Sequence, residues 1–296
     1  MEVLVFGAGS LGSLLGGLLA REHDVTLVGR DPHAATVAKE GLRVTGTVEA
    51  TVEPRAVTDL PADCGADLAV VTVKAYDTEE AARALSDCDL AAALSLQNGL
   101  GNEATLAAHL ECPVLAGTCT YGALLEAPGR VACTGVGEVV LGAREGGASA
   151  TADEAGAAFD AAGVETTVAT DMPRRLWEKL AVNAGINATT ALARVENGAL
   201  LDGPAREVAA DAARETARAA RAAGVDLADE AAVAAVERVA EATAANTSSM
   251  RQDCQDGRRT EVDAINGYVA DHAERAPVNR TLAGLLRAWE RARDLR

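Results

Sequence analysis

The sequence predicts an α/β protein, in which an N-terminal domain built on a parallel sheet is followed by an all-helical C-terminal domain. Two observations predict this fold class. Short apolar runs alternate with helix-like stretches as far as residue 119, which is the rhythm of strand, crossover helix and parallel strand. After residue 170 every stretch has helical spacing and no strand candidate intervenes. We therefore expect two domains, 1–170 and 171–296, with the boundary near 168–173.

The expected elements follow in chain order. A strand at 2–6 leads through a Gly-rich turn at 7–12 into a helix that continues to Arg21, and a second strand follows at 24–29. Further strands are expected at 66–73, 91–96 and 113–119, with helices at 77–85 and 103–110. Alternating Val and Thr at 42–57 predict an inserted strand pair, and 129–142 predicts added edge strands. Helices are then expected at 174–192, 204–223, 230–245, 258–275 and 279–293.

The turn after the first strand predicts a Rossmann-type dinucleotide-binding domain. Its residues are Gly7, Ala8, Gly9, Ser10, Leu11 and Gly12, a Gly-x-Gly-x-x-Gly motif between a strand and a helix. The first glycine permits the turn, the second lets a pyrophosphate approach the backbone, and the third lets helix and strand pack closely. Free N–H groups and the helix dipole then bind phosphate. The alternative is a Gly-rich turn that binds nothing.

The end of the second strand favours NADP(H) over NAD(H). Many NAD-binding chains carry Asp or Glu there for the ribose hydroxyls, whereas this chain has Val28, Gly29 and Arg30. A guanidinium suits the 2′-phosphate of NADP(H). Asp31 follows directly and is within reach of the ribose, so NAD(H) stays the alternative.

A polar stripe on an otherwise apolar helix is the first candidate for catalysis. Lys179, Asn183 and Asn187 follow one another at intervals of four, so they share one face of a helix. Only three lysines stand beside 24 arginines in this chain, and a desolvated lysine can give up a proton near neutral pH where arginine cannot. The ordinary alternative is a surface lysine followed by two amides that pack between helices.

Three further segments carry polar candidates. Asn98 and Lys74 each follow an expected strand, at the carboxyl edge where open α/β sheets bind ligands. The segment from Asn246 to Ser249 joins two helices, and Ser249 with Gln252 matches a capping box. Glu261 has only the ordinary interpretation of an exposed acidic residue in an acidic protein.

Composition excludes several classes of partner and site. The chain has 27 basic and 44 acidic residues, a net charge of -17, which disfavours nucleic acid and anionic membranes. No apolar run reaches the roughly 18 residues of a membrane span, and no leader is recognisable, so we expect a cytoplasmic protein. Six cysteines without a Cys-x-x-Cys pair or a histidine at metal spacing predict reduced thiols and no metal site. The acidity indicates either adaptation to a saline cytoplasm or a coding bias against lysine.

Together these motifs resemble the ketopantoate reductases (2-dehydropantoate 2-reductases), and the similarity runs the length of the chain. The resembling segments are Gly7–Gly12, Val73–Ala75, Leu96–Gly101, Trp177–Asn187, Asn246–Asp253 and Thr260–Gly267. Gly122 stands where relatives often have another small residue. The strong acidity is also atypical of the family.

The resemblance implies a role for each candidate. Lys179 would be the general acid, and Asn98 would touch both cofactor and substrate. The substrate would be held by Asn183, Asn187, Asn197, Asn246 and Ser249. The cofactor side would be lined by Lys74, Gly122 and Glu261, in addition to the glycine loop and Arg30.

The implied activity is the NADPH-dependent reduction of ketopantoate to (R)-pantoate, a step toward pantothenate and coenzyme A. The small keto acid would be the partner molecule, and a homodimer is the assembly we consider. Two alternatives stay open. One is a dehydrogenase of the same build that acts on another small 2-keto or hydroxy acid. The other is a non-catalytic NADP-sensing protein whose helical domain is an interaction surface.

Overall fold

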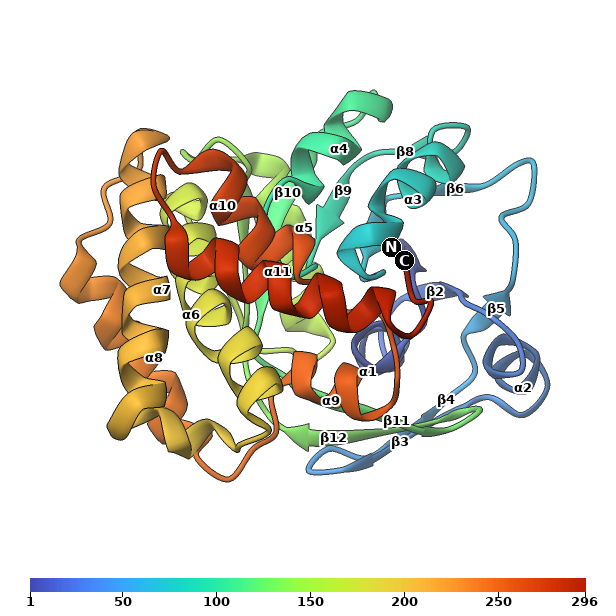
Figure 1. Cartoon of the computed structure of the whole chain (residues 1–296). Coiled ribbons are helices and arrows are strands. Elements are labelled where there is room, and N and C mark those ends of the chain that lie inside the picture. Colours follow the sequence, from blue (N-terminus) through green and yellow to red (C-terminus); the bar gives the residue numbers. More distant parts are fainter. The chain divides into compact units, whose positions relative to one another are not determined.

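The computed structural model describes all 296 residues and confirms the α/β class with an N-terminal Rossmann-type part and a helical C-terminal part (Figure 1). The chain forms two compact units. The first comprises residues 1–97 and 101–172, and the second comprises residues 98–100 and 173–296. The short segment 98–100 therefore packs with the helical unit, which the sequence did not indicate.

The first unit is built on an eight-stranded sheet with the order β14-β13-β10-β9-β7-β1-β2-β5. All neighbouring strands are parallel except β10 and β13. From β5 to β10 this is the dinucleotide-binding order, which reverses between β1 and β7. The strands are β1 (Glu2–Phe6), β2 (Asp24–Val28), β5 (Arg55–Val57), β7 (Leu68–Val71), β9 (Ala93–Ser95), β10 (Val114–Cys119), β13 (Val139–Ala143) and β14 (Thr166–Val168).

Apolar side chains on both faces of this sheet form the core of the first unit. Alternate residues of a strand point to opposite faces, and β1 accordingly contributes Val3 and Val5 to one buried cluster and Leu4 to the other. Phe159 of α5 is fully buried in the first cluster, and Leu106 of α4 is fully buried in the second. The helices are α1 (Ser10–Leu19), α2 (His33–Glu40), α3 (Thr78–Leu85), α4 (Asn102–His109) and α5 (Ala150–Ala161), with a short 3-10 turn at Ala75–Asp77.

A second sheet of the first unit has the order β11-β12-β3-β4, and α1 packs against it (Figure 1). Its strands are β11 (Gly122–Ala127), β12 (Arg130–Gly135), β3 (Leu42–Gly46) and β4 (Ala50–Val52). The expected pair within 42–57 exists as the β3–β4 hairpin, while β5 joins the large sheet. The expectation of edge strands at 129–142 was wrong. Each of β12 and β13 lies between two other strands, because β3 and β14 pair with their far sides.

The expectation that all six cysteines are reduced thiols was also wrong. Cys64 and Cys88 form a disulfide with their Cα atoms 4.9 Å apart. They directly precede two short parallel strands, β6 (Gly65–Ala66) and β8 (Asp89–Leu90), whose pairing brings the cysteines together. The spacing of the cysteines does not predict this disulfide, because they are 24 residues apart and only strand pairing brings them together. Cys112, Cys119, Cys133 and Cys254 are free.

The second unit is helical, and alanine dominates its core. Its elements are α6 (Met172–Ala193), a 3-10 turn (Asn197–Leu200), α7 (Gly203–Ala222), α8 (Asp229–Ala242), α9 (Ser249–Gln255), a π-turn (Asp263–Gly267), α10 (Tyr268–His272) and α11 (Pro277–Arg291). Helices α7 and α8 lie side by side (Figure 1), and small buried residues such as Ala213 and Ala217 let them approach closely. The helix expected at 258–275 is reduced to the π-turn and α10. None of the helices combines the length and the apolarity that crossing a membrane requires.

Candidate active site

The glycine loop between β1 and α1 is closed toward the sheet and open at its tip. Gly7 has a φ of +113°, and a Cβ there would lie 2.6 Å from the Val73 nitrogen. A Cβ on Gly12 would overlap the Gly7 carbonyl, so helix and loop are in direct contact. A Cβ on Gly9 would meet no atom nearer than 4.0 Å. The loop thus leaves an open cradle at Gly9, where the N-terminus of α1 begins.

Side chains that flank the loop are hydrogen-bonded to the second sheet. The Leu125 N–H of β11 donates to Ser10 Oγ across 3.1 Å. The buried His33 accepts from the Gly129 N–H at Nδ1 (3.0 Å) and lies 2.9 Å from Ser13 Oγ at Nε2. Burial lowers the pKa of this imidazole below 6.5. The loop is therefore tied to the small sheet at two points.

Two residues of opposite charge, Arg30 and Asp31, follow β2 after Gly29. Asp31 Oδ1 accepts a hydrogen bond from the Ala35 N–H in the first turn of α2 (3.1 Å), so this carboxylate is engaged by the helix. Arg30 is exposed, and its guanidinium makes no ion pair. This end of β2 therefore carries an exposed guanidinium beside a carboxylate that accepts a backbone hydrogen bond.

Lys74 and Gly122 also belong to the first unit. Lys74 is partly buried and lies between the end of β7 and the 3-10 turn at Ala75–Asp77. Gly122 is the first residue of β11, and a Cβ there would crowd the Thr134 side chain. Lys74 lies at the same carboxyl edge of the large sheet as the glycine loop, because β1 and β7 are parallel neighbours.

A buried hydrogen-bond network fixes the chain just before Asn98. Gln97 is only 4% exposed, and its amide donates to the Val73 carbonyl (3.0 Å) and to Thr78 Oγ1 (2.7 Å). Thr78 Oγ1 in turn donates to Asn102 Oδ1 (2.9 Å). These hydrogen bonds anchor the Gln97 side chain within the first unit.

Asn98 meets Glu261 within the second unit. The Asn98 amide donates to Glu261 Oε2 across 3.3 Å, and the Glu261 side chain is buried. Gly99 has a φ of +84°, and a Cβ there would lie 2.5 Å from the Ala264 carbonyl, so only glycine fits. The Leu100 N–H donates to the same carbonyl (3.2 Å). The interpretation of Glu261 as an exposed acidic residue was wrong, because the pairing of two distant segments buries it.

The polar stripe on α6 contains an unsatisfied donor. Lys179 and Asn183 are partly buried, and Asn187 is buried. The Nδ2 atom of Asn183 is inaccessible to solvent and has no hydrogen-bond partner. An unpaired buried donor costs about 1–3 kcal/mol, so its presence indicates a partner that this chain does not supply.

The turn after α6 contains a second unsatisfied group. Asn197 is buried, and its amide donates to Thr243 Oγ1 (2.9 Å) while its Oδ1 has no partner. The Asn197 N–H donates to the backbone carbonyl of Asn246, which is itself exposed (3.1 Å). An acceptor on Asn197 and a donor on Asn183 thus both lack a hydrogen-bond partner within this chain.

The capping residue of α9 is Ser248, one residue before the serine that the sequence indicated. Ser248 Oγ accepts from the Arg251 N–H (3.3 Å) and contacts Thr190 Oγ1 of α6 at 2.7 Å. Ser249 is exposed and does not cap the helix. The capping-box spacing favours Ser249, but the hydrogen bond from the Arg251 N–H identifies Ser248 as the cap.

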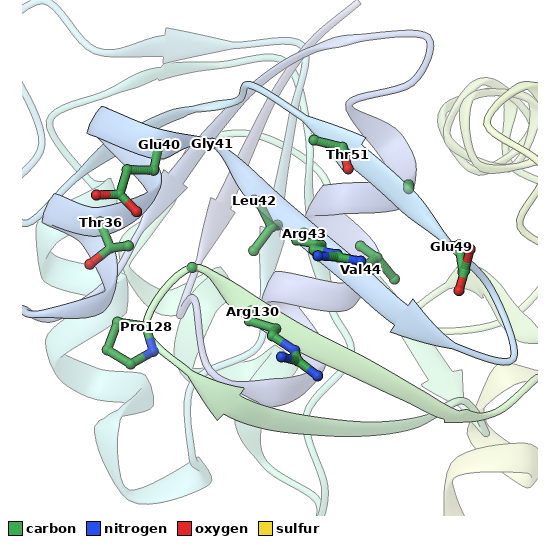
Figure 2. Close-up of a pocket in the computed structure, with 12 residues that line it drawn as sticks. Thr36, Glu40, Gly41, Leu42, Arg43, Val44, Glu49, Thr51, Pro128 and Arg130 are labelled. Atoms are coloured by element: carbon green, nitrogen blue, oxygen red, sulfur yellow. The ribbon is translucent and has the colours of Figure 1, made fainter.

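A separate cavity of about 540 Å³ lies at the small sheet, away from every predicted site residue (Figure 2). Arg43 of β3 and Arg130 of β12 stand on adjacent strands there, and Arg130 is paired with Glu126 at 2.7 Å. The lining residues are Thr36, Glu40, Gly41, Leu42, Arg43, Val44, Glu49, Ala50, Thr51, Pro128, Gly129 and Arg130. Their charges are mixed and open to solvent, so this cavity is not the candidate site.

Comparison with known proteins agrees with this arrangement along the whole chain. Residues 3–146 match the family described as ketopantoate reductase PanE/ApbA, and residues 171–290 match its C-terminal domain. A 2-dehydropantoate 2-reductase from Halobacterium salinarum is 48% identical over 98% of this chain and 99% of its own length. One from Archaeoglobus fulgidus is 40% identical over 98% of both chains.

A solved structure shows the same fold at a similar level of identity. The PanE/ApbA family ketopantoate reductase from Ralstonia eutropha superposes with a TM-score of 0.91 at 34% identity, covering 99% of this chain and all of the other. Both family domains are thus present in order and nearly complete. The chain belongs to the ketopantoate reductase family and is an oxidoreductase.

Proposed function

We propose that this enzyme reduces 2-dehydropantoate (ketopantoate) to (R)-pantoate with NADPH, as a step toward pantothenate and coenzyme A. The observation that carries the proposal is the unpaired, buried Nδ2 of Asn183 on the α6 stripe that also holds Lys179. A small ligand rich in oxygen atoms matches such a donor. The names of the relatives support ketopantoate as that ligand.

The residues of the first unit fit a dinucleotide phosphate. The open cradle at Gly9 gives a pyrophosphate access to the backbone, and Ala8, Ser10 and Leu11 complete the loop around it. Arg30 would take the 2′-phosphate, and this is favoured because Asp31 is engaged by α2. Lys74 and Gly122 would line the same side. NADPH, when bound, supplies the hydride that the keto carbon receives.

Lys179 would supply the proton. As the carbonyl carbon becomes tetrahedral, negative charge grows on its oxygen, and an ammonium directed at that oxygen both stabilises the charge and protonates it. The keto acid then leaves as a hydroxy acid, having gained one hydride and one proton. Arginine would hold the charge but release no proton at neutral pH.

The amides of the second unit would orient the substrate. Asn183 offers a donor for a carboxylate or keto oxygen, while Asn197 offers an acceptor for the substrate hydroxyl. Asn187 lies one turn further along α6. Asn246 and Ser249, both exposed, would close the far end of the site. Asn98 would touch the nicotinamide and the substrate, with Glu261 holding its amide.

The deciding experiment is an assay of the purified enzyme with a panel of 2-keto acids, each with NADPH and with NADH. We expect ketopantoate with NADPH to give the highest kcat/KM. Faster turnover of another keto acid would identify that acid as the substrate, and no turnover of any member would contradict the proposed substrate class. A homodimer and a cytoplasmic location stay predictions.

A further inference from the structure

The second unit contains a fully buried carboxylate with no part in the proposed chemistry. Glu290 of α11 has no exposed surface. Its Oε1 accepts two hydrogen bonds from Thr260, one from the N–H (2.8 Å) and one from Oγ1 (2.5 Å). Its Oε2 accepts from Arg296 Nε across 2.6 Å. Both carboxylate oxygens of Glu290 therefore accept hydrogen bonds, and Oε1 accepts both of its bonds from Thr260.

Thr260 stands directly before Glu261 in the chain. A residue held at both its backbone N–H and its side chain cannot rotate freely, so the peptide that leads into Glu261 is fixed. Glu261 is buried and accepts from the Asn98 amide at 3.3 Å. A continuous chain of contacts thus runs from Glu290 through Thr260 and Glu261 to Asn98.

The residue two positions after Glu261 is held by the same C-terminal segment. Asp263 Oδ1 accepts from Arg287 Nε of α11 at 2.8 Å, and its Oδ2 accepts from Arg296. Burial tends to raise the pKa of Asp263, but hydrogen bonds from the two guanidinium groups outweigh it and hold that pKa below its usual value. Arg296 bridges Glu290 and Asp263, so it joins the two clamps on either side of Glu261.

We propose that Glu290 is a positioning residue, which holds Glu261 against Asn98 and thereby shapes the nicotinamide end of the cofactor site. A buried ion pair contributes little to stability compared with apolar side chains of similar size, so stability alone is a weak reason for a carboxylate here. The two hydrogen bonds that Glu290 accepts from Thr260 give a specific reason, which is to fix the backbone before Glu261. The proposal rests on the proposed function, since it takes Asn98 and Glu261 to be cofactor contacts.

The test compares two ligands that share the adenosine end of the cofactor. NADPH carries nicotinamide and its ribose, whereas adenosine 2′,5′-bisphosphate has the 2′-phosphate and lacks both. In Glu290→Gln we expect the Kd for NADPH to rise about tenfold, as for the loss of one good hydrogen bond, and the Kd for the bisphosphate to change less than about twofold. Equal changes for both ligands would overturn the proposal.

Two further comparisons keep the result interpretable. Glu215→Gln removes an equally buried carboxylate that accepts from Asn279 at the start of α11, and we expect it to lower the Tm without changing the ratio of the two Kd values. If Glu290→Gln fails to fold, Thr260→Val tests the proposal instead, because it removes the hydroxyl that donates to Glu290. Thr260→Ser keeps that hydroxyl and should show the wild-type ratio of the two Kd values. An unchanged ratio in Thr260→Val would also overturn the proposal. The wild-type keto-acid assay separately tests the proposed function.

Discussion

The Nε2 atom of His33 lies 2.9 Å from the hydroxyl oxygen of Ser13. Because the Gly129 N–H donates to Nδ1, that nitrogen must be the acceptor, and the proton of the neutral ring sits on Nε2. Nε2 then donates to Ser13, whose hydroxyl donates to the Ala8 carbonyl at 3.2 Å. Three buried hydrogen bonds thus connect the turn before β12 with the glycine loop.

This relay predicts a loss of stability on mild acidification. Burial lowers the pKa of His33 in the folded protein below 6.5. As the pH falls below 6.5, His33 binds a proton in the unfolded chain but stays neutral in the folded one. The free energy of unfolding therefore declines from its value at pH 7. The slope for one group is at most about 1.4 kcal/mol per pH unit. We expect the Tm between pH 7 and 5.5 to fall less steeply in His33→Gln than in wild type. The control His109→Gln should keep the wild-type slope, and an identical slope in all three proteins would remove His33 as the cause.

Substitution of Lys179 should separate charge from proton transfer. A positioned general acid contributes about 10² to 10⁴ in rate, so Lys179→Ala should lose at least that factor in kcat with ketopantoate. Lys179→Arg keeps the charge and should still be strongly impaired, because arginine is a poor proton donor. The matched control is Lys39→Ala, since Lys39 forms only an exposed pair with Glu40 (3.3 Å). Turnover like wild type in Lys179→Ala would contradict the assignment.

Removal of Arg30 should affect one cofactor and spare the other. The pairing of its guanidinium with a 2′-phosphate predicts a loss of roughly 10- to 150-fold in kcat/KM with NADPH for Arg30→Ala, and little change with NADH. Arg55→Ala is the control. Arg55 is also exposed and unpaired, but it is the first residue of β5, whereas Arg30 follows the carboxyl end of β2. Equal losses with both cofactors would mean that Arg30 serves the adenine or the fold instead.

The Cys64–Cys88 disulfide predicts a measurable loss on reduction. It closes a loop of 24 residues, and a cross-link of that length restricts the unfolded chain by about 3 kcal/mol in the chain-entropy model. A thiol reductant should therefore lower the Tm of the wild type and leave that of the double variant Cys64→Ser, Cys88→Ser unchanged. Cys112→Ser, which removes a free thiol, should respond to the reductant as the wild type does. A Tm insensitive to reductant in all three proteins would mean that the bond adds no stability.

The net charge of -17 predicts stabilisation by salt. The Debye length shrinks from about 10 Å at 0.1 M to about 3 Å at 1 M, so repulsion among the surface carboxylates is screened. If the acidity is an adaptation to a saline cytoplasm, the Tm should rise from roughly 0.1 M to molar KCl. A flat or falling Tm would leave coding bias as the explanation of the missing lysines.

Local patterns were sufficient for the loop and the helices that carry the proposed site. The turn at Gly7–Gly12 and the stripe from Lys179 to Asn187 are each defined within a dozen residues, so their geometry follows from the period of one element. Helix α5 was not predicted although Ser149 caps it, because its many alanines and its one glycine give almost no amphipathic contrast.

Contacts between distant segments could not be predicted from the same patterns. The β12–β3 pairing joins residues almost 90 positions apart, and the Asn98–Glu261 bond joins residues 163 apart. The resemblance singled out Glu261, but no pattern of residue types distinguishes Glu261 or Glu290 from exposed carboxylates, because only the fold buries them. The disulfide partners were likewise visible only once β6 and β8 were paired.

The π-turn at Asp263–Gly267 makes the length of this segment as important as its residue types. Its defining bond runs from the Gly267 N–H to the Val262 carbonyl, so it holds one residue more than an α-helical turn. One residue corresponds to about 100° of rotation around a helix axis. Deleting Ala264 would therefore turn every later side chain of the segment relative to Glu261, and Val269 would leave the core it now fills. Substitutions here change single contacts, whereas a one-residue deletion changes the phase of the whole element.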